Sequence, residues 1–165
     1  MIKLMSPDDP QRIKLMEADE CAARIAQAET DEQTRRRTIM YCLERSIEGF
    51  PPNLISNNRT FVDSIDVDDI PDMGGIPFPS GNESGVNAAP LPCTLFLFDD
   101  RLLIVKRPTQ TVPGRTLSGL DEMDKAMRTG GLPINIKKGS MTCKGAVDIT
   151  DLVATDVGGA GMYLN

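Results

Sequence analysis

The sequence contains no histidine and no tryptophan among its 165 residues, and only 4% of its residues are aromatic. Without histidine, Ser-His and Cys-His nucleophile pairs and the commonest general base are excluded. The sequence also lacks G-x-x-x-x-G-K-[ST] and G-x-G-x-x-G runs, so nothing in it indicates nucleotide binding. We therefore expect no covalent catalysis and no cofactor, and a core built from aliphatic side chains and methionine.

Cysteines are few and widely spaced, at Cys21, Cys42, Cys93 and Cys143. None of them forms a paired C-x-x-C motif, so the sequence predicts neither a structural zinc site nor a disulfide framework. We expect reduced thiols, mostly in the interior, and no bound metal.

Positive charge is also scarce, because 18 basic residues face 24 acidic ones and leave a formal net charge of −6. This balance argues against nucleic acid as a partner and disfavours an anionic membrane surface. No apolar run approaches the roughly 18 residues needed to cross a bilayer, and the start, MIKLMSPDDP, lacks the apolar stretch of a signal peptide. We expect a cytoplasmic protein.

The first 50 residues have the pattern of an amphipathic helix. Asp9 before Pro10 is a good N-cap, and Gly49 followed by two prolines supplies the end. Thr30 and Gln33 fit a capping box that could start a second helix. No glycine or proline interrupts the run, so we favour one helix of about 40 residues. Its predicted apolar stripe consists of Ile13, Met16, Cys21, Ile25, Ala28, Ile39, Leu43 and Ile47.

Beyond a linker at 51–58, the pattern changes to that of strands. RTFVDSIDV alternates Phe61, Ile65 and Val67 with polar neighbours, and the hydrophobic hairpin CTLFLFDDRLLIVKR spans residues 93–107. Both faces of the hairpin are apolar, which predicts a central position in the sheet.

Two segments, 68–92 and 108–140, are rich in loop-forming residues. The second should hold one short helix, with Ser118 as N-cap and Gly130 at its end. Two or three short strands should follow. The expected fold class is therefore α+β: a long amphipathic helix followed by a small antiparallel sheet or incomplete barrel over residues 59–165.

The run LFLFDDRLLIVKRP resembles the second and third strands of a pleckstrin-homology barrel that follows a Dbl-homology domain. The segment LMSPDDPQRIKLMEADECAARIAQAETDEQTRR is similar to the last helix of such a Dbl-homology domain. With FPPNLISNNRTFVDSIDVDDI at the joint, nearly the whole chain looks like a fungal Rho-type guanine nucleotide exchange factor of the bud-site-selection and septation class.

The resemblance implies a GTPase regulator without covalent chemistry. In this family the helical bundle ejects GDP from a Rho-family GTPase, and the protein acts in cell polarity or septation, at the cell cortex or septum. The family's last helix presents an asparagine to the GTPase, whereas the aligned positions here are Glu29, Thr30 and Asp31. The candidate GTPase contacts are Gln27, Thr30, Asp31 and Gln33.

The resemblance further implies that the rest of the bundle precedes Met1 and that the barrel is cut short at Asn165. We therefore expect this chain alone to have no exchange activity. The alternative is a non-catalytic interaction module, a scaffold with a pleckstrin-homology-like barrel.

Phosphoinositide binding is expected to be weak or absent. The loop that would hold the headgroup carries Asp66, Asp68, Asp69, Asp72 and Glu83, and no basic residue lies between Arg59 and Arg101. Lys106, Arg107 and Arg115 form a modest basic patch elsewhere.

Overall fold

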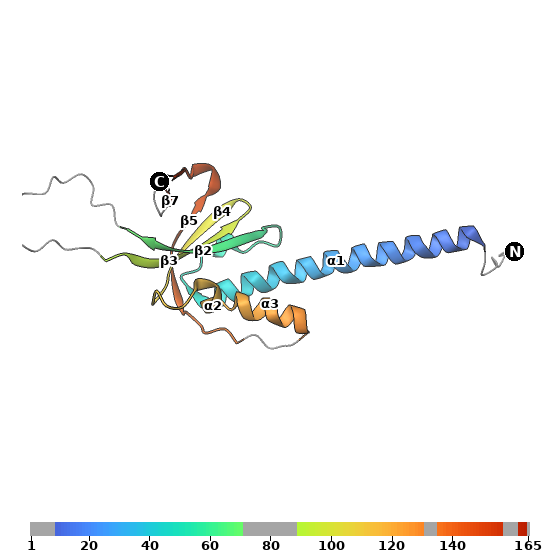
Figure 1. Cartoon of the computed structure of the whole chain (residues 1–165), viewed down its shortest axis with the longest axis horizontal. Coiled ribbons are helices and arrows are strands. Elements are labelled where there is room, and N and C mark those ends of the chain that lie inside the picture. Colours follow the sequence, from blue (N-terminus) through green and yellow to red (C-terminus); the bar gives the residue numbers. More distant parts are fainter. Residues whose placement is uncertain (1–8, 71–88, 131–134, 157–161, 165) are drawn as a thin grey trace, which may run out of the picture.

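The structure is a computed structural model that describes residues 9–70, 89–130, 135–156 and 162–164. Its most prominent element is α1, Pro10–Ser46, an unbroken helix of 37 residues that extends far beyond the rest of the molecule (Figure 1). The Asp9 carboxylate accepts a hydrogen bond of 2.9 Å from the backbone N–H of Gln11. The predicted N-cap and the single continuous helix are both confirmed.

The chain then forms short helices and strands that make up a compact module at the C-terminal end of α1 (Figure 1). The 3-10 turns are η1, Pro52–Leu54, and η2, Ile149–Asp151; the short helices are α2, Gly114–Leu117, and α3, Leu120–Thr129. The strands are β1 Ile47–Glu48, β2 Phe61–Asp69, β3 Leu91–Phe98, β4 Arg101–Lys106, β5 Met141–Asp148, β6 Ala154–Asp156 and β7 Met162–Leu164.

The main sheet has the strand order β1-β5-β4-β3-β2. Strands β2 to β5 pair antiparallel, but β1 pairs parallel to β5, with Ile47 opposite Met141. The sheet is therefore mixed, because the chain leaves α1 directly into a strand at the sheet's far edge. β6 and β7 form a separate two-stranded sheet. The mixed α and β content agrees with the predicted fold class, although the strands do not all run antiparallel as we expected.

The predicted hairpin is confirmed as β3 and β4, which occupy the centre of the sheet. Its two faces have different surroundings. Phe96 and Phe98 are fully buried on the face that packs against the end of α1, whereas Leu95 and Leu97 lie on the opposite face. The core on the α1 side consists of Ile39, Met40, Cys42, Leu43, Ile47, Leu54, Phe96, Phe98, Leu103, Val105, Leu120, Met123, Ile136 and Met141.

The predicted alternation of β2 is wrong at its start, because a β-bulge lies between Phe61 and Asp63. The extra residue shifts the following side chains to the other face of the sheet. As a result Phe61 packs edge-on against Phe98 with 5.8 Å between ring centroids, while Ile65 is exposed on the other face.

The predicted short helix is present as α3, which ends at Gly130 with the left-handed φ of 69°. Ser118 is not its N-cap as we expected. Gly119 holds that position, and Ser118 instead ends the unpredicted helix α2. The φ of 79° at Gly119 allows the tight turn between the two helices, because a residue with a Cβ adopts that conformation at a cost.

Helix α2 lies unusually close to the sheet. A Cβ atom on Gly114 would lie 2.0 Å from the Thr94 hydroxyl oxygen, so only glycine fits without a shift. The Asp66 carboxylate holds both groups, accepting 2.7 Å from the Thr94 hydroxyl and 3.1 Å from the Gly114 N–H.

The predicted linker at 51–58 is packed into the module. Leu54 is fully buried in the core, and Arg59 donates to the Asp100 carboxylate over 2.7 and 2.9 Å. Arg59 also reaches back to the Leu54 carbonyl. These contacts join the segment after α1 to the turn between β3 and β4.

Candidate functional site

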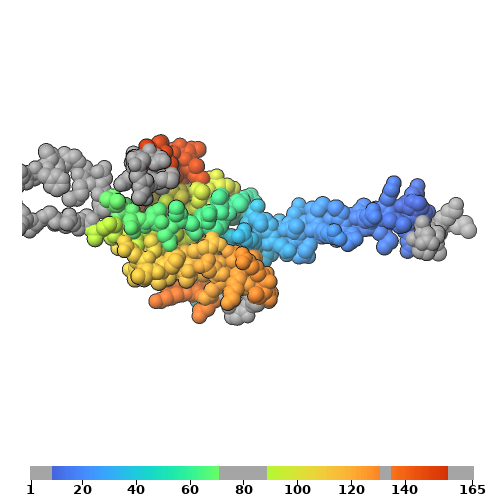
Figure 2. All heavy atoms as spheres, viewed as in Figure 1, coloured from blue at the N-terminus to red at the C-terminus, as the bar shows by residue number. Residues whose placement is uncertain are grey.

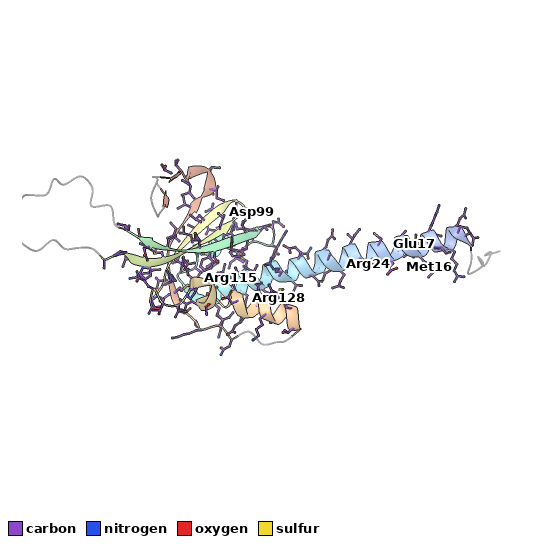
Figure 3. The ribbon with its side chains drawn as sticks, in the orientation of Figure 1. Met16, Glu17, Arg24, Asp99, Arg115 and Arg128 are labelled. Carbon is purple, nitrogen blue, oxygen red and sulfur yellow. The ribbon has the colours of Figure 1, made fainter. Side chains whose placement is uncertain are left out.

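Two parts of α1 differ in their surroundings. We call residues 10–34 the shaft, whose side chains are almost all exposed, and residues 35–46 the base, which packs on the sheet and α3. Figure 2 shows the shaft as a narrow rod projecting from the module. In Figure 3 the labelled side chains of Met16, Glu17 and Arg24 radiate from this rod, well away from the module.

The shaft is helical without a core of its own, and local interactions support it. Arg24 pairs with Glu20 over 2.6 Å, and the Gln27 amide donates 2.8 Å to Asp31. Such i,i+4 pairs each contribute about 0.2–0.5 kcal/mol to an isolated helix. Because the base anchors one end, the shaft needs no separate nucleation step.

The base holds the shaft in a fixed direction. Ile39 and Leu43 are buried beneath the sheet, and Arg35 forms an ion pair of 3.7 Å with Asp124 of α3. The helix also passes directly into β1, so no flexible joint separates the shaft from the sheet.

All four candidate contact residues are exposed on the shaft, within about two and a half turns of the base. At about 3.6 residues per turn, Gln27, Thr30 and Asp31 occupy one side of the helix within about 100°. Gln33 is six residues from Gln27, which places it about 120° away around the axis. A partner could contact the first three together and Gln33 only at its margin.

The hydroxyl of Thr30 is engaged within the helix. Its hydroxyl donates 2.9 Å to the Ala26 carbonyl, and the same bond repeats from Thr34 to Thr30 and from Thr38 to Thr34. Because each hydroxyl proton is used within the helix, Thr30 offers a partner an acceptor oxygen and a methyl group.

The predicted apolar stripe is not continuous along the shaft. Met16 and Ile25 are nine residues apart, or about two and a half turns, so they lie on opposite sides. Both are exposed, at 62% and 57%. Ile39, Leu43 and Ile47 are buried as predicted.

The arginine run has a mainly structural position. Arg35 binds α3, Arg36 pairs with Glu32 over 3.1 Å, and Arg37 is exposed. The first two arginines therefore help to fix the junction between shaft and base.

Of the basic patch predicted from Lys106, Arg107 and Arg115, only Lys106 is a largely exposed cation. Arg107 is only 4% exposed, and its guanidinium donates to the carbonyls of Cys93 and Val112 and to neighbouring loop carbonyls. Arg115 pairs with Asp121 over 2.9 Å and with Asp124. The number of basic residues in a segment does not reveal this burial. An arginine that binds loop carbonyls in the interior cannot be distinguished by sequence from one exposed to solvent.

The acidic segment is largely engaged as well. Asp66 receives the Thr94 hydroxyl and the Gly114 N–H, Asp68 accepts from Gln110, and Asp69 pairs with Lys144 of β5. Asp72 and Glu83, which we also assigned to this segment, lie outside the described residues.

The thiols follow the division between shaft and module. Burial raises the pKa of Cys42 to about 11, and burial also raises the pKa of Cys93 and of Cys143. Cys21 is exposed on the shaft. Over residues 9–70 and the other described ranges, no group of three or more His, Cys, Asp or Glu side chains is arranged to hold a metal ion.

A shallow pocket of about 420 Å³ opens on the sheet face opposite α1. Leu95, Leu97 and Leu102 form its floor, and Ile149 and Leu152 after β5 form one wall. Asp63 and Ser64 are its polar lining residues. The sequence indicates that both faces of the hairpin are apolar, but the partial cover of this face depends on segments that are distant in the sequence.

Comparisons with protein-family models, with curated protein sequences and with solved structures found no match to this chain. Among the described helices, none combines the length and apolar character that a bilayer crossing requires.

Proposed function

We propose that this chain is part of a guanine nucleotide exchange factor that activates a Rho-family GTPase by promoting GDP release. The observation that carries the proposal is the shaft: an exposed helix, held rigidly by its base, that presents Gln27, Thr30 and Asp31 on one side. In the family that the sequence resembles, the corresponding helix contacts the GTPase.

The mechanism would be differential binding. An exchange factor prefers the nucleotide-free GTPase and shifts the equilibrium toward it, so it needs a preformed surface and no nucleophile. A shaft whose direction is fixed meets this need, because little conformational entropy is lost when the partner binds. The Gln27–Asp31 pair would exchange its internal hydrogen bond of 2.8 Å for bonds to the GTPase.

The proposal assigns the activity to the protein that contains this chain together with further helices of the bundle. One exposed helix offers only part of a GTPase footprint, so the 165-residue chain alone is expected to be inactive. The incomplete pleckstrin-homology-like barrel and the placement at the cell cortex or septum belong to the same proposal. No cofactor is required.

The test measures release of a fluorescent GDP analogue from a panel of Rho-family GTPases, with the natural gene product that contains this chain. The Gln27→Ala/Asp31→Ala double variant should slow release about tenfold, because two hydrogen bonds contribute about 0.5–1.5 kcal/mol each. Gln11→Ala is the matched control, since Gln11 is also exposed but lies about 160° away around the helix.

Acceleration by the wild-type protein that is lost in the double variant and kept in the control supports the proposal. If the wild-type protein accelerates release from no Rho-family GTPase, the proposal is wrong.

A non-catalytic interaction module is the second candidate function. The partly covered apolar pocket on the sheet favours it, because soluble proteins use such exposed apolar surface for binding. In that case the gene product would bind a protein partner without changing nucleotide release.

A further inference from the structure

The shaft carries an exposed apolar seam, which we define as Leu15, Ala18, Ala22 and Ile25. These residues are spaced by three, four and three, like the a and d positions of two successive heptads of a coiled coil. All four are exposed, Leu15 at 58% and Ile25 at 57%.

The seam lies on the side of α1 that the module buries further along. Ile25 and Leu43 are 18 residues apart, about five full turns, and therefore face the same way. Between them the same side carries Glu29, Glu32 and Arg36. The charged interval separates the seam from the core, so the seam forms a distinct surface.

The seam also differs from the proposed GTPase surface. Gln27, Thr30 and Asp31 are centred about 150° from it around the helix axis. An inference about the seam therefore goes beyond the proposed function, and it concerns the 165-residue chain without further helices packed on the shaft.

We propose that the seam binds the same seam of a second copy of this chain, in an antiparallel arrangement. With the two-fold axis near residue 20, Leu15 of one copy lies opposite Ile25 of the other, and Ala18 lies opposite Ala22. The interface is isologous, since each contact occurs twice. The central alanines let the two helices approach closely, and the larger residues close both ends.

Charge selects the antiparallel orientation. Lys14 borders the N-terminal end of the seam, and Glu29 follows its C-terminal end. Antiparallel pairing brings Lys14 of one copy toward Glu29 of the other. A parallel pair would place like charges together.

The shape of the molecule is also compatible with this pairing. Antiparallel shafts place the two modules at opposite ends, and residue 10 of one copy reaches only about residue 30 of the other. The ion pair that joins α3 to α1 is at Arg35, beyond that point. The modules therefore do not collide.

Two features keep the dimer weak. The seam has only two large residues per chain, and Asp19 of each copy lies next to Asp19 of the other near the axis. We expect a dimer that dissociates on dilution, with a mass that rises from 18.0 kDa toward twice that value as concentration increases.

The experiment is sedimentation equilibrium of the 165-residue chain over a wide range of concentrations. Ile25→Glu should abolish dimerisation, and Met16→Glu should not, because Met16 is equally exposed but lies on the opposite side. Asp19→Asn should shift the transition to lower concentration by removing the like-charge pair. Circular dichroism checks that each variant keeps its helix.

A second measurement uses Cys21, the exposed cysteine beside the seam. A short bismaleimide should link two chains through Cys21 in the wild-type protein and in Met16→Glu, but not in Ile25→Glu or Cys21→Ser. A chain that remains monomeric at every concentration would overturn the proposal and assign the seam to other helices or partners. Equal loss of the dimer in Ile25→Glu and Met16→Glu would overturn it as well.

Discussion

Ile25 and Leu43 lie on the same side of one helix, yet Ile25 is 57% exposed and Leu43 is fully buried. The exposed fractions of the two side chains differ because different parts of the molecule surround them. The module covers α1 only from Arg35 onward, whereas side chains of the shaft meet solvent. One helix therefore serves two purposes: its base completes a hydrophobic core, and its shaft presents a surface.

The largest expected contrast between the two parts is in thiol reactivity. Cys21 on the shaft should react with maleimide within seconds to minutes. Cys42 in the base is fully buried and has a pKa raised to about 11. Its thiol can therefore react with maleimide only when the module unfolds transiently. If the free energy of unfolding is about 5 kcal/mol or more, the need for unfolding slows the labelling of Cys42 on the order of 1000-fold.

Peptide mapping by mass spectrometry after timed labelling measures both rates in one sample. Labelling in denaturant is the control, since all cysteines should then react alike. Similar rates for Cys21 and Cys42 in the folded protein would contradict the division of α1.

Truncating Leu43 and Ile25 to alanine should lower the free energy of unfolding to very different extents. Leu43→Ala should lower the free energy of unfolding by about 2–5 kcal/mol, because it leaves a cavity in the core. Ile25→Ala should change it by less than about 0.5 kcal/mol, since the side chain is largely exposed. Urea denaturation followed by circular dichroism measures both values, and comparable losses would show that the shaft is covered in solution.

The smallest expected contrast concerns two ion pairs. In the module, the hydrogen bond from Arg59 holds the pKa of Asp100 below its ordinary value of 3.8. Because the folded-state pKa is the lower one, the pair stabilises the fold above about pH 4, and this contribution is lost as the pH falls below that value. Asp100→Asn should therefore cost up to about 1 kcal/mol at pH 7 and less at pH 3.

The matched variant on the shaft is Glu20→Gln, which removes the pairing charge toward Arg24. Both partners of that pair are mostly exposed, so the expected loss is about 0.3 kcal/mol or less. Urea denaturation at pH 7 and pH 3 measures the two variants. An Asp100→Asn effect that does not change with pH would argue against the ion pair as its cause.

Much of the local structure could be predicted because its signals are local. Asp9 and Pro10 mark the start of α1, and the hairpin of β3 and β4 follows from strand-forming runs around a short turn. The misses have long-range causes. The bulge in β2 depends on pairing with β3, and the partner of β1 is β5, almost 100 residues away.

The candidate site also has features that could be predicted from the sequence and features that could not. Helix periodicity alone places Gln27, Thr30 and Asp31 on one side and the seam on another. Periodicity did not show that Arg107 would be enclosed by loop carbonyls, which removed the basic patch.

The sequence by itself determined where the long helix begins, which residues share a side of it, and which run forms the central hairpin. These properties depend on backbone preferences and on side-chain spacing within one segment. Only the tertiary structure decided which part of the helix is covered, because burial depends on segments that are distant in the sequence. That decision makes Leu43 part of the core and leaves Ile25 available for a partner.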